Sequence, residues 1–302
     1  MNKVKAWIQA SRLLSQSYIL LPLLLGQGYA VMEREIIFDW TIFLWILLFS
    51  FAIQLYIVYG NDYNDLETDR LNCTFTVFSG GSRVLVENRL SQRELAIGIW
   101  VMVALNVFVG SVLTIFYKRH FTLPMIVLCM FLLYLYSFRP FRFNYRGGGE
   151  LLQIMGVAIV LPIIGYYAQS NVIHLMKLPW NLVLVLLPFH LSNAVSTSLP
   201  DYPSDKTCHK KTLVVLLGPQ KAKYLVIFLN FLSIFLFVLT GWIGVREYAT
   251  YIIILGPFIA NLSMLFLIRG SDAGTPRLTA FVAMNVIGVT ILFNLMIIIH
   301  LL

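Results

Sequence analysis

Two short acidic segments hold the residues of this chain that are best suited to chemistry. Six of its 14 acidic residues lie in them, namely Asp62, Asp65, Glu67, Asp69, Asp201 and Asp205. Each segment follows a long apolar run, and each contains an Asp-x-x-x-Asp spacing. Carboxylates at a membrane boundary are costly to desolvate and usually have a partner. The two segments therefore call for a functional explanation.

The first segment is interpreted as the last turns of a helix. At about 100° per residue, Asn61, Asp62, Asp65 and Asp69 share one helical face, and Glu67 points away from it. Like charges on one stripe repel each other unless a positive group lies between them. Carboxylates and carboxamides are hard oxygen ligands of the kind that Mg²⁺ takes, together with water and phosphate. Two such segments facing each other predict Mg²⁺ ions that bridge a diphosphate; the alternative is a solvated helix end.

Prolines and basic residues accompany these segments. Pro200 and Pro203 predict that the second segment breaks at the membrane edge and restarts as a new helix. The basic residues that follow the two segments most closely are Arg70, Arg83, Lys206 and Lys210. For Arg83, Lys206 and Lys210, phosphate contact and ordinary loop charge explain the sequence equally well.

The elements that position these residues are predicted to be transmembrane helices. Of the 302 residues, 59% are hydrophobic and 12% are charged, whereas a soluble domain has about 25% charged residues. We expect an integral membrane protein whose partner is the lipid bilayer, and the composition excludes a nucleic-acid-binding domain, a disordered chain and a secreted disulfide scaffold.

Nine apolar windows are long enough to cross a bilayer, which takes about 20 residues. They are Leu13–Met32, Trp40–Asn61, Leu95–Tyr117, His120–Phe138, Leu151–Ile173, Leu178–Pro200, Tyr224–Val245, Tyr248–Ile268 and Leu278–Leu302. None shows the alternation of a membrane barrel strand. We therefore predict an all-α membrane protein, with nine transmembrane helices in one bundle that forms a single domain over residues 1–302.

Loop charge predicts the orientation. Most of the 22 Lys and Arg residues fall on the side that carries the N-terminus and both acidic segments. Basic loops stay in the cytoplasm. We expect a multi-pass protein of the inner (cytoplasmic) cell membrane, with the N-terminus and the acidic site on the cytoplasmic side and the C-terminus outside.

Together these features resemble the UbiA superfamily of intramembrane prenyltransferases. The resemblance rests on Asn61, Asp65 and Asp69 after the second span, on Asp201 and Asp205 after the sixth, and on the number of spans. The stretch from Tyr136-Ser137-Phe138-Arg139-Pro140 to Tyr145-Arg146-Gly147-Gly148-Gly149-Glu150 is similar to the family's loop after its fourth helix, and Lys210-Lys211-Thr212-Leu213 is similar to the stretch after its second motif.

The resemblance implies a Mg²⁺-dependent transfer of a polyprenyl group from polyprenyl diphosphate to an acceptor, commonly aromatic. It implies that Asp65, Asp69, Asp201 and Asp205 are catalytic and hold Mg²⁺ together with Asn61. The residues assigned to substrate binding are Asn61, Asp62, Arg70, Arg83, Tyr136, Arg139, Arg146, Lys206 and Lys210. Asp62 is not at one of the family's key positions. His209 stands where relatives often have Gly, which leaves the shape of that loop open.

Within the family, the Asn-Asp-Tyr start of the first motif and the Tyr-Arg-Gly-Gly-Gly-Glu loop look most like the branch that prenylates 1,4-dihydroxy-2-naphthoate in menaquinone biosynthesis. 4-Hydroxybenzoate and a non-aromatic acceptor stay open as alternatives. His190, in a span without charges, is expected to be a hydrogen-bonded core histidine rather than a group that activates the acceptor.

The sequence agrees less well with two other protein classes. A secondary transporter or cation-binding membrane protein would use the acids as an ion path, but it should place charged or broken segments near the bilayer midplane. A phosphatidyltransferase that uses a CDP-alcohol would need an Asp-Gly-x-x-Ala-Arg element, which this sequence lacks. The prenyltransferase is the leading hypothesis.

Overall fold

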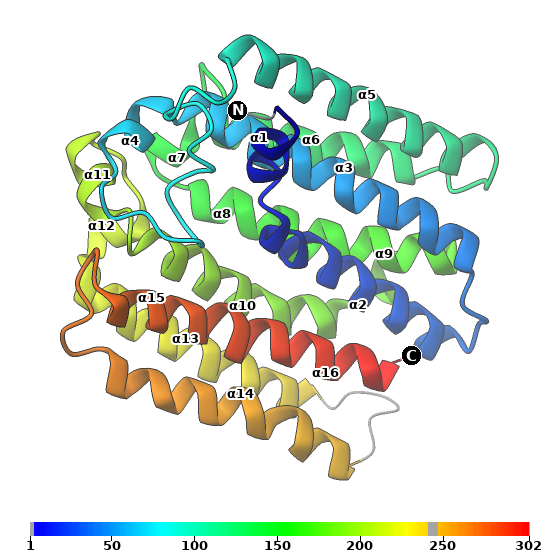
Figure 1. Cartoon of the computed structure of the whole chain (residues 1–302). Helices are drawn as coiled ribbons and strands as arrows, with labels where there is room; N and C mark the ends of the chain where they lie inside the picture. The colour runs from blue at the N-terminus through cyan, green and yellow to red at the C-terminus, as the bar shows by residue number, and fades with distance from the viewer. Residues whose placement is uncertain (1–2, 241–246, 302) are drawn as a thin grey trace.

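Long apolar helices make up most of the computed structural model, which describes residues 3–240 and 247–301 (Figure 1). The long helices are α2 (Ser17–Arg34), α3 (Trp40–Asn64), α5 (Gln92–Ile115), α6 (Thr122–Ser137), α10 (Trp180–Ser198), α13 (Pro219–Thr240) and α14 (Glu247–Leu267). Two further segments join α-helix to π-helix: α8 (Gly149–Ile154) with η2 (Met155–Val160) and α9 (Leu161–Ser170), and α15 (Pro276–Ala283) with η4 (Met284–Ile291) and α16 (Leu292–Leu301).

Short helices connect the long ones. They are α1 (Lys3–Ala10), η1 (Leu13–Gln16), α4 (Leu66–Leu71), α7 (Phe143–Arg146), η3 (Leu175–Lys177), α11 (Tyr202–Thr207) and α12 (Leu213–Leu217). Four of these, α4, α7, α11 and α12, gather at the same end of the long helices (Figure 1). Both acidic segments therefore lie at this end of the molecule.

The prediction of an all-helical protein is confirmed for the described residues. Five helical segments are long and apolar enough to cross a membrane, and Thr122–Ser137 and Ile253–Leu267 are shorter apolar helices. Helix covers most of each predicted window, although Val245 and Leu302, which end two of the windows, lie outside the described residues. The count of nine spans and the orientation of the chain ends stay predictions.

Glycine allows α2 and α9 to cross closely. A Cβ atom on Gly26 would lie 2.0 Å from the carbonyl oxygen of Pro162, and one on Gly165 would lie 2.1 Å from the carbonyl oxygen of Leu23. Small residues allow such close backbone contact between membrane helices. The crossing fixes the position of α2. It thereby also positions the η1 turn, which precedes α2 and leads to the acidic end.

Buried asparagines link the helices of the other half of the molecule. Asn230 of α13 donates hydrogen bonds to Asn261 of α14 (2.9 Å) and Asn285 of η4 (2.8 Å). Asn285 in turn donates to Asn193 of α10 (2.9 Å). In an apolar surrounding, such amide contacts hold helices in register because an unpaired amide is costly there.

Candidate active site

The first acidic segment bends at Asp65. Helix α3 ends at Asn64, Asp65 has φ −100° and ψ 10°, and α4 starts at Leu66. The predicted continuous helical face through this segment is therefore wrong. The bend turns the carboxylate of Asp65 toward α7 and Lys210, whereas that of Asp62 meets Arg12 and Ser82. The predicted break in the second segment is confirmed, since α10 ends at Ser198 and α11 starts at Tyr202 with Pro203 in its first turn.

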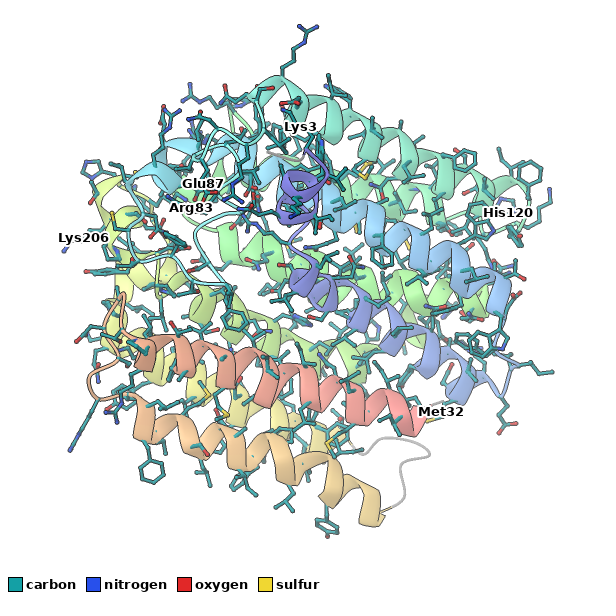
Figure 2. The ribbon with its side chains drawn as sticks, viewed as in Figure 1. Lys3, Met32, Arg83, Glu87, His120 and Lys206 are labelled. Atoms are coloured by element: carbon teal, nitrogen blue, oxygen red, sulfur yellow. The ribbon has the colours of Figure 1, made fainter. Side chains whose placement is uncertain are left out.

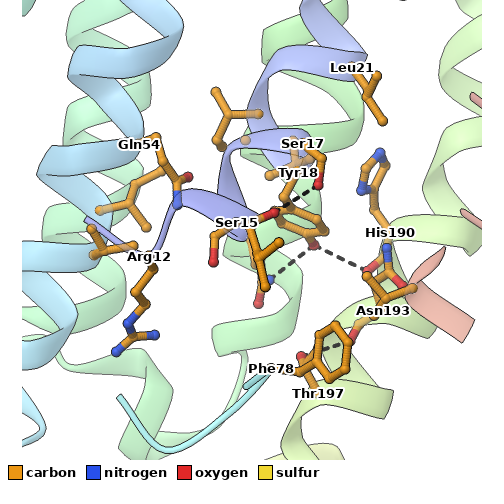
Figure 3. Close-up of a pocket in the computed structure, with 18 of the residues that line it drawn as sticks. Arg12, Ser15, Ser17, Tyr18, Leu21, Gln54, Phe78, His190, Asn193 and Thr197 are labelled. Atoms are coloured by element: carbon orange, nitrogen blue, oxygen red, sulfur yellow. Dashed lines mark hydrogen bonds between the residues drawn. The ribbon is translucent and has the colours of Figure 1, made fainter. Parts of the chain in front are cut away.

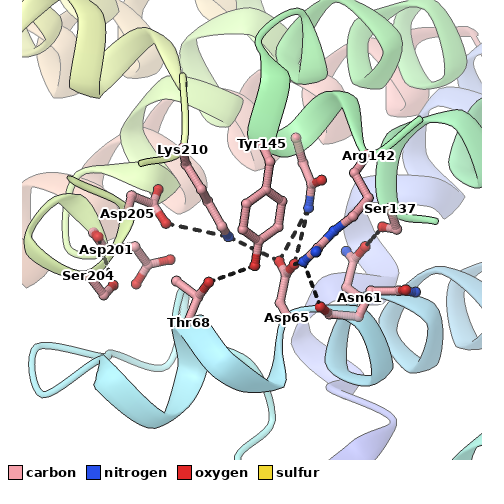
Figure 4. A network of polar contacts seen from close by, with 12 residues as sticks. Asn61, Asp65, Thr68, Ser137, Arg142, Tyr145, Asp201, Ser204, Asp205 and Lys210 are labelled. Carbon is pink, nitrogen blue, oxygen red and sulfur yellow. Dashed lines mark hydrogen bonds and ion pairs between the residues drawn. The ribbon is translucent and has the colours of Figure 1, made fainter. Parts of the chain in front are cut away.

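Lys210 joins the two acidic segments (Figure 4). Its Nζ atom lies 3.2 Å from Oδ2 of Asp65 and 3.4 Å from Oδ1 of Asp205, and 4.6 Å from the centre of the Tyr145 ring. Burial lowers the pKa of Lys210, but the two carboxylates outweigh burial and hold this pKa well above its ordinary value. The lysine is therefore the positive group that the closely spaced acids require.

The connection after α6 supports Asp65 from the other side. Nδ2 of Asn144 donates to Oδ1 of Asp65 at 3.2 Å, and the Arg142 guanidinium lies 4.0 Å from the same oxygen. Arg142 also stacks 3.7 Å from the ring centre of Tyr145, whose hydroxyl bonds to Thr68 of α4 at 2.6 Å. Sequence reasoning missed Arg142, Asn144 and Tyr145, although they lie inside the stretch that resembles the family's loop.

A glycine-containing loop closes over the remaining two carboxylates. Asp201 accepts hydrogen bonds from Nδ2 of Asn72 (2.7 Å) and from the backbone N–H of Gly80 (3.2 Å). Gly81 has φ +73°, and a Cβ atom there would lie 2.1 Å from Oδ2 of Asp69. Arg83 holds the loop by donating to the carbonyl oxygens of Asp69 (2.5 Å) and Asn72 (3.2 Å).

Burial, together with neighbouring carboxylates, disfavours the ionised form of two of the acids. Burial and the charge of Asp65 raise the pKa of Asp69 to about 7, even though Arg12 and Lys210 act to lower it. Burial likewise raises the pKa of Asp205 to about 6, with further contributions from Asp201 and Asp65. A bound divalent cation would relieve this repulsion.

The donor set fits a cation that is held in part by its substrate. The carboxylates come from two segments that face each other across Lys210 (Figure 4). Over the described ranges, no group of three or more His, Cys, Asp or Glu residues is placed to hold a metal ion by itself. Mg²⁺ usually takes one or two carboxylates and completes its shell with water and phosphate oxygens, so the arrangement suits Mg²⁺ with a diphosphate.

Asp62 and Asn61 have different surroundings. Asp62 is 3% exposed, and its carboxylate pairs with Arg12 and accepts hydrogen bonds from the backbone N–H (3.1 Å) and the hydroxyl of Ser82. Asp62 therefore connects two segments to α3, namely the N-terminal segment that contains Arg12 and the loop that contains Gly81 and Ser82. The oxygen of Asn61 accepts from Ser137 at 2.5 Å, and Asn61 lines a cavity.

Four of the predicted substrate-binding side chains point outward. Arg70, Arg139, Arg146 and Lys206 are exposed, and none forms an ion pair with the acids within the described part of the chain. The ammonium of Lys206 lies 5.7 Å from the ring centre of Tyr202. Arg142, which lies between Arg139 and Arg146 in the sequence, is the arginine of this loop that lies beside Asp65.

A cavity of about 600 Å³ lies among the helices, and Asn61 and Tyr136 are among its wall residues. Figure 3 shows other residues of its wall, including Arg12, Tyr18 and His190. Much of its wall is apolar, including Leu132, Leu133 and Val157. Its polar wall residues include Tyr18, Gln54, His190, Asn193 and Thr197. The cavity can hold an apolar group, and its wall reaches the first acidic segment through Asn61.

His190 differs from the expectation of a hydrogen-bonded core histidine. It is 1% exposed, and neither ring nitrogen has a hydrogen-bond partner among the described residues. The Tyr18 ring packs edge-on against the imidazole with their centres 5.1 Å apart. That expectation is wrong, and a buried imidazole without partners needs another explanation.

Comparison with known proteins gives one family. Residues 19–287 match the family model described as the UbiA prenyltransferase family. No curated protein matches the sequence.

Solved structures share the fold over nearly the whole chain. The apo structure of a UbiA homolog from Aeropyrum pernix K1 has a TM-score of 0.70 at 18% identity, covering 94% of this chain and 98% of that chain. A UbiA homolog from Archaeoglobus fulgidus bound to GPP and Mg²⁺ has a TM-score of 0.66 at 17% identity, covering 97% and 99%. A structure of digeranylgeranylglyceryl phosphate synthase has a TM-score of 0.62 at 19% identity, covering 100% and 99%.

Proposed function

Because the chain belongs to the UbiA prenyltransferase family, we propose that it transfers a polyprenyl group from polyprenyl diphosphate to an aromatic acceptor inside the membrane, with Mg²⁺ as cofactor. Family membership favours the enzyme over the transporter. The observation that carries the proposal is the position of Lys210, which lies between Asp65 and Asp205 at the end of the long helices where Asn61, a wall residue of the cavity, also lies.

The site has the groups that this reaction needs. Mg²⁺ held by Asn61, Asp65, Asp69, Asp201 and Asp205 would supply positive charge to the leaving diphosphate. Lys210 and Arg142 add fixed positive charge beside Asp65. The support from a relative is the Archaeoglobus fulgidus homolog that is bound to GPP and Mg²⁺.

The cavity would take the prenyl tail. The allylic C–O bond breaks, the electron pair leaves with the diphosphate, and the allylic carbon forms a bond to a carbon of the acceptor. That carbon then loses its proton, or carbon dioxide where it is the carbon that carries the carboxylate. Apolar walls such as Leu132 and Val157 keep water from the allylic cation. The aromatic faces of Tyr136 and Phe78, which also line the cavity, can stabilise positive charge.

We further propose 1,4-dihydroxy-2-naphthoate as the acceptor, which would place the enzyme in menaquinone biosynthesis. The support is the resemblance of the Asn61-Asp62-Tyr63 start and the Tyr145–Glu150 loop to that branch. The match to a digeranylgeranylglyceryl phosphate synthase keeps a non-aromatic acceptor as the alternative, next to 4-hydroxybenzoate. The excess of Lys and Arg at the acidic end supports an inner-membrane protein whose site opens to the cytoplasm.

The test is transfer of a radiolabelled prenyl group in membranes that contain the protein, with and without Mg²⁺. 1,4-Dihydroxy-2-naphthoate, 4-hydroxybenzoate and a glycerol phosphate lipid are offered in parallel. We expect label in the naphthoate, and its loss when EDTA removes the metal. Label in another acceptor would overturn the naphthoate proposal and keep the reaction type. No transfer with any prenyl length or acceptor would contradict the proposed function.

A further inference from the structure

The cavity has a polar stripe that the prenyl tail does not need. His190, Asn193 and Thr197 all line the cavity from α10. Their spacings of three and four residues place them on one face of the helix, which leads toward Asp201. His190 lies about 16 Å from Asp201 along the chain at the helical rise of about 1.5 Å per residue. The stripe therefore runs from the acidic end into the bundle.

Two groups of the deep cavity wall are left without hydrogen-bond partners. They are both ring nitrogens of His190 and the side-chain oxygen of Asn294, and both residues are 1% exposed. The rings of the preceding residues, Phe189 and Phe293, lie 4.6 Å apart, so the turns that carry His190 and Asn294 are neighbours. Buried polar groups in folded proteins are almost always paired.

The surrounding polar groups are already paired with each other. The hydroxyl of Tyr18 accepts from Gln153 at 3.0 Å and donates to the carbonyl oxygen of His190 at 3.4 Å (Figure 3). The oxygen of Asn193 accepts from Asn285 at 2.9 Å and from Thr290 at 3.2 Å. Among the described wall residues, the imidazole of His190 and the oxygen of Asn294 are left without a hydrogen-bond partner, as is Nε of Arg12 at the acidic end of the wall.

A prenyl tail offers no hydrogen bond to either group, but an acceptor that carries hydroxyl groups does. A neutral imidazole donates through one nitrogen and accepts through the other, and an amide oxygen accepts. We propose that the deep end of this cavity binds the acceptor of the proposed transfer reaction, with His190 and Asn294 forming hydrogen bonds to oxygen groups of its ring. The proposal rests on the proposed function, and it makes His190 an acceptor-binding residue.

Direct binding tests this proposal without turnover. The probes are 1-hydroxy-2-naphthoate and 4-hydroxybenzoate, titrated by calorimetry into the purified full-length protein in nanodiscs. The variants are His190→Phe, which fills the space without a hydrogen bond, and His190→Gln, which keeps a donor and an acceptor. His120→Gln is the matched control, because His120 is exposed and lies across the molecule from Arg83 (Figure 2). Thermal unfolding of each variant is recorded alongside.

We expect the wild-type protein to bind at least one probe, and His190→Phe to bind it about tenfold more weakly, the loss that one neutral hydrogen bond gives. His190→Gln should recover part of this affinity, and His120→Gln should match the wild type. The unfolding midpoints should agree among the four proteins. In the transfer assay, His190→Phe should raise the KM for the acceptor and leave the KM for the prenyl diphosphate unchanged.

Three results would overturn the proposal. They are no binding of either probe to the wild type, unchanged binding by His190→Phe, and equal losses of affinity and thermal stability in both His190 variants, which would indicate a purely structural histidine. Absence of transfer by a wild-type protein that binds the probe in a His190-dependent way would contradict the proposed function instead. The two failures are thus distinguishable.

Discussion

Lys210 connects the second acidic segment to the first. It is 8% exposed, and its ammonium contacts Asp65 and Asp205 while facing the ring of Tyr145. A buried cation between two carboxylates fixes their separation, because each carboxylate would otherwise repel the other across a poorly solvated space. The lysine therefore sets the spacing into which a diphosphate and its metal must fit.

Replacing Lys210 with Met should lower kcat/KM for the prenyl diphosphate by about 10- to 100-fold, since a hydrogen bond to a charged group contributes about 1.5–3 kcal/mol. Lys211→Met is the matched control, because Lys211 is exposed and only its backbone N–H contacts Tyr145. Steady-state transfer kinetics in detergent check this. Equal activities of the two variants would show that Lys210 has no part in the reaction.

Asp65→Ala and Asp205→Ala should each reduce transfer by at least about 100-fold, because each removes a proposed metal-holding carboxylate. Both proteins should still insert into the membrane. The matched control is Glu67→Ala, whose side chain is exposed on α4. Transfer rates in membranes, normalised to protein content, give the comparison. Full activity of either Asp variant would contradict the proposal that both acidic segments hold the metal.

At this scale, spacing predicted the acids better than it predicted the groups around them. Asp65 and Asp205 could be chosen because few acids occur in an apolar chain. Arg142 could not be chosen in this way, because its approach to Asp65 depends on the left-handed backbone at Arg142 (φ +45°) and on the short helix α7 that follows. His190 shows the same limit, because a sequence does not tell whether a buried ring nitrogen has a partner.

At the scale of elements, α2 and α9 cross so closely that two glycines leave no room for a Cβ atom. Gly26→Ala and Gly165→Ala would each bring a methyl group within 2.0–2.1 Å of a backbone oxygen. Backbone cannot yield as a side chain does, so we expect each change to lower the free energy of unfolding by about 1–3 kcal/mol. Thermal unfolding followed by tryptophan fluorescence measures the effect.

Gly156→Ala is the control for this measurement, because the nearest atom to a Cβ there is 3.9 Å away. It should unfold within about a degree of the wild type, since a single well-tolerated change shifts the free energy by only a few tenths of a kcal/mol. A loss of stability equal to that of Gly26→Ala would mean that general helix disturbance, rather than the close crossing, explains the result.

Apolar length was enough to predict where the long helices run, because a segment in lipid must satisfy its own backbone. Apolar length did not predict where these helices are interrupted. At its bend, Asp65 contacts Asn144 and Lys210, which are far away in the sequence. The π-helical segments η2 and η4 contain no proline from which they could have been predicted.

For the whole molecule, the predicted orientation in the membrane can be tested at the cysteines. Cys73 is exposed at the acidic end, Cys129 is buried and Cys208 is partly exposed. In a Cys208→Ser protein, a membrane-impermeant maleimide should label Cys73 in inside-out vesicles and spare it in intact cells. Adding His120→Cys should give labelling from the opposite side. The reverse pattern would place the acidic end outside the cell.

The two π-helical segments both border the cavity, through Gly156 and Val157 of η2 and through Val286, Ile287 and Thr290 of η4. A π-helical hydrogen bond spans five residues instead of the four of an α-helix, and one residue of an α-helix corresponds to a rotation of about 100°. Deleting a single residue from either segment would therefore replace a whole row of wall side chains at once. Insertion or deletion of one residue in η2 or η4 is therefore expected to change the shape of the cavity more than a single substitution does.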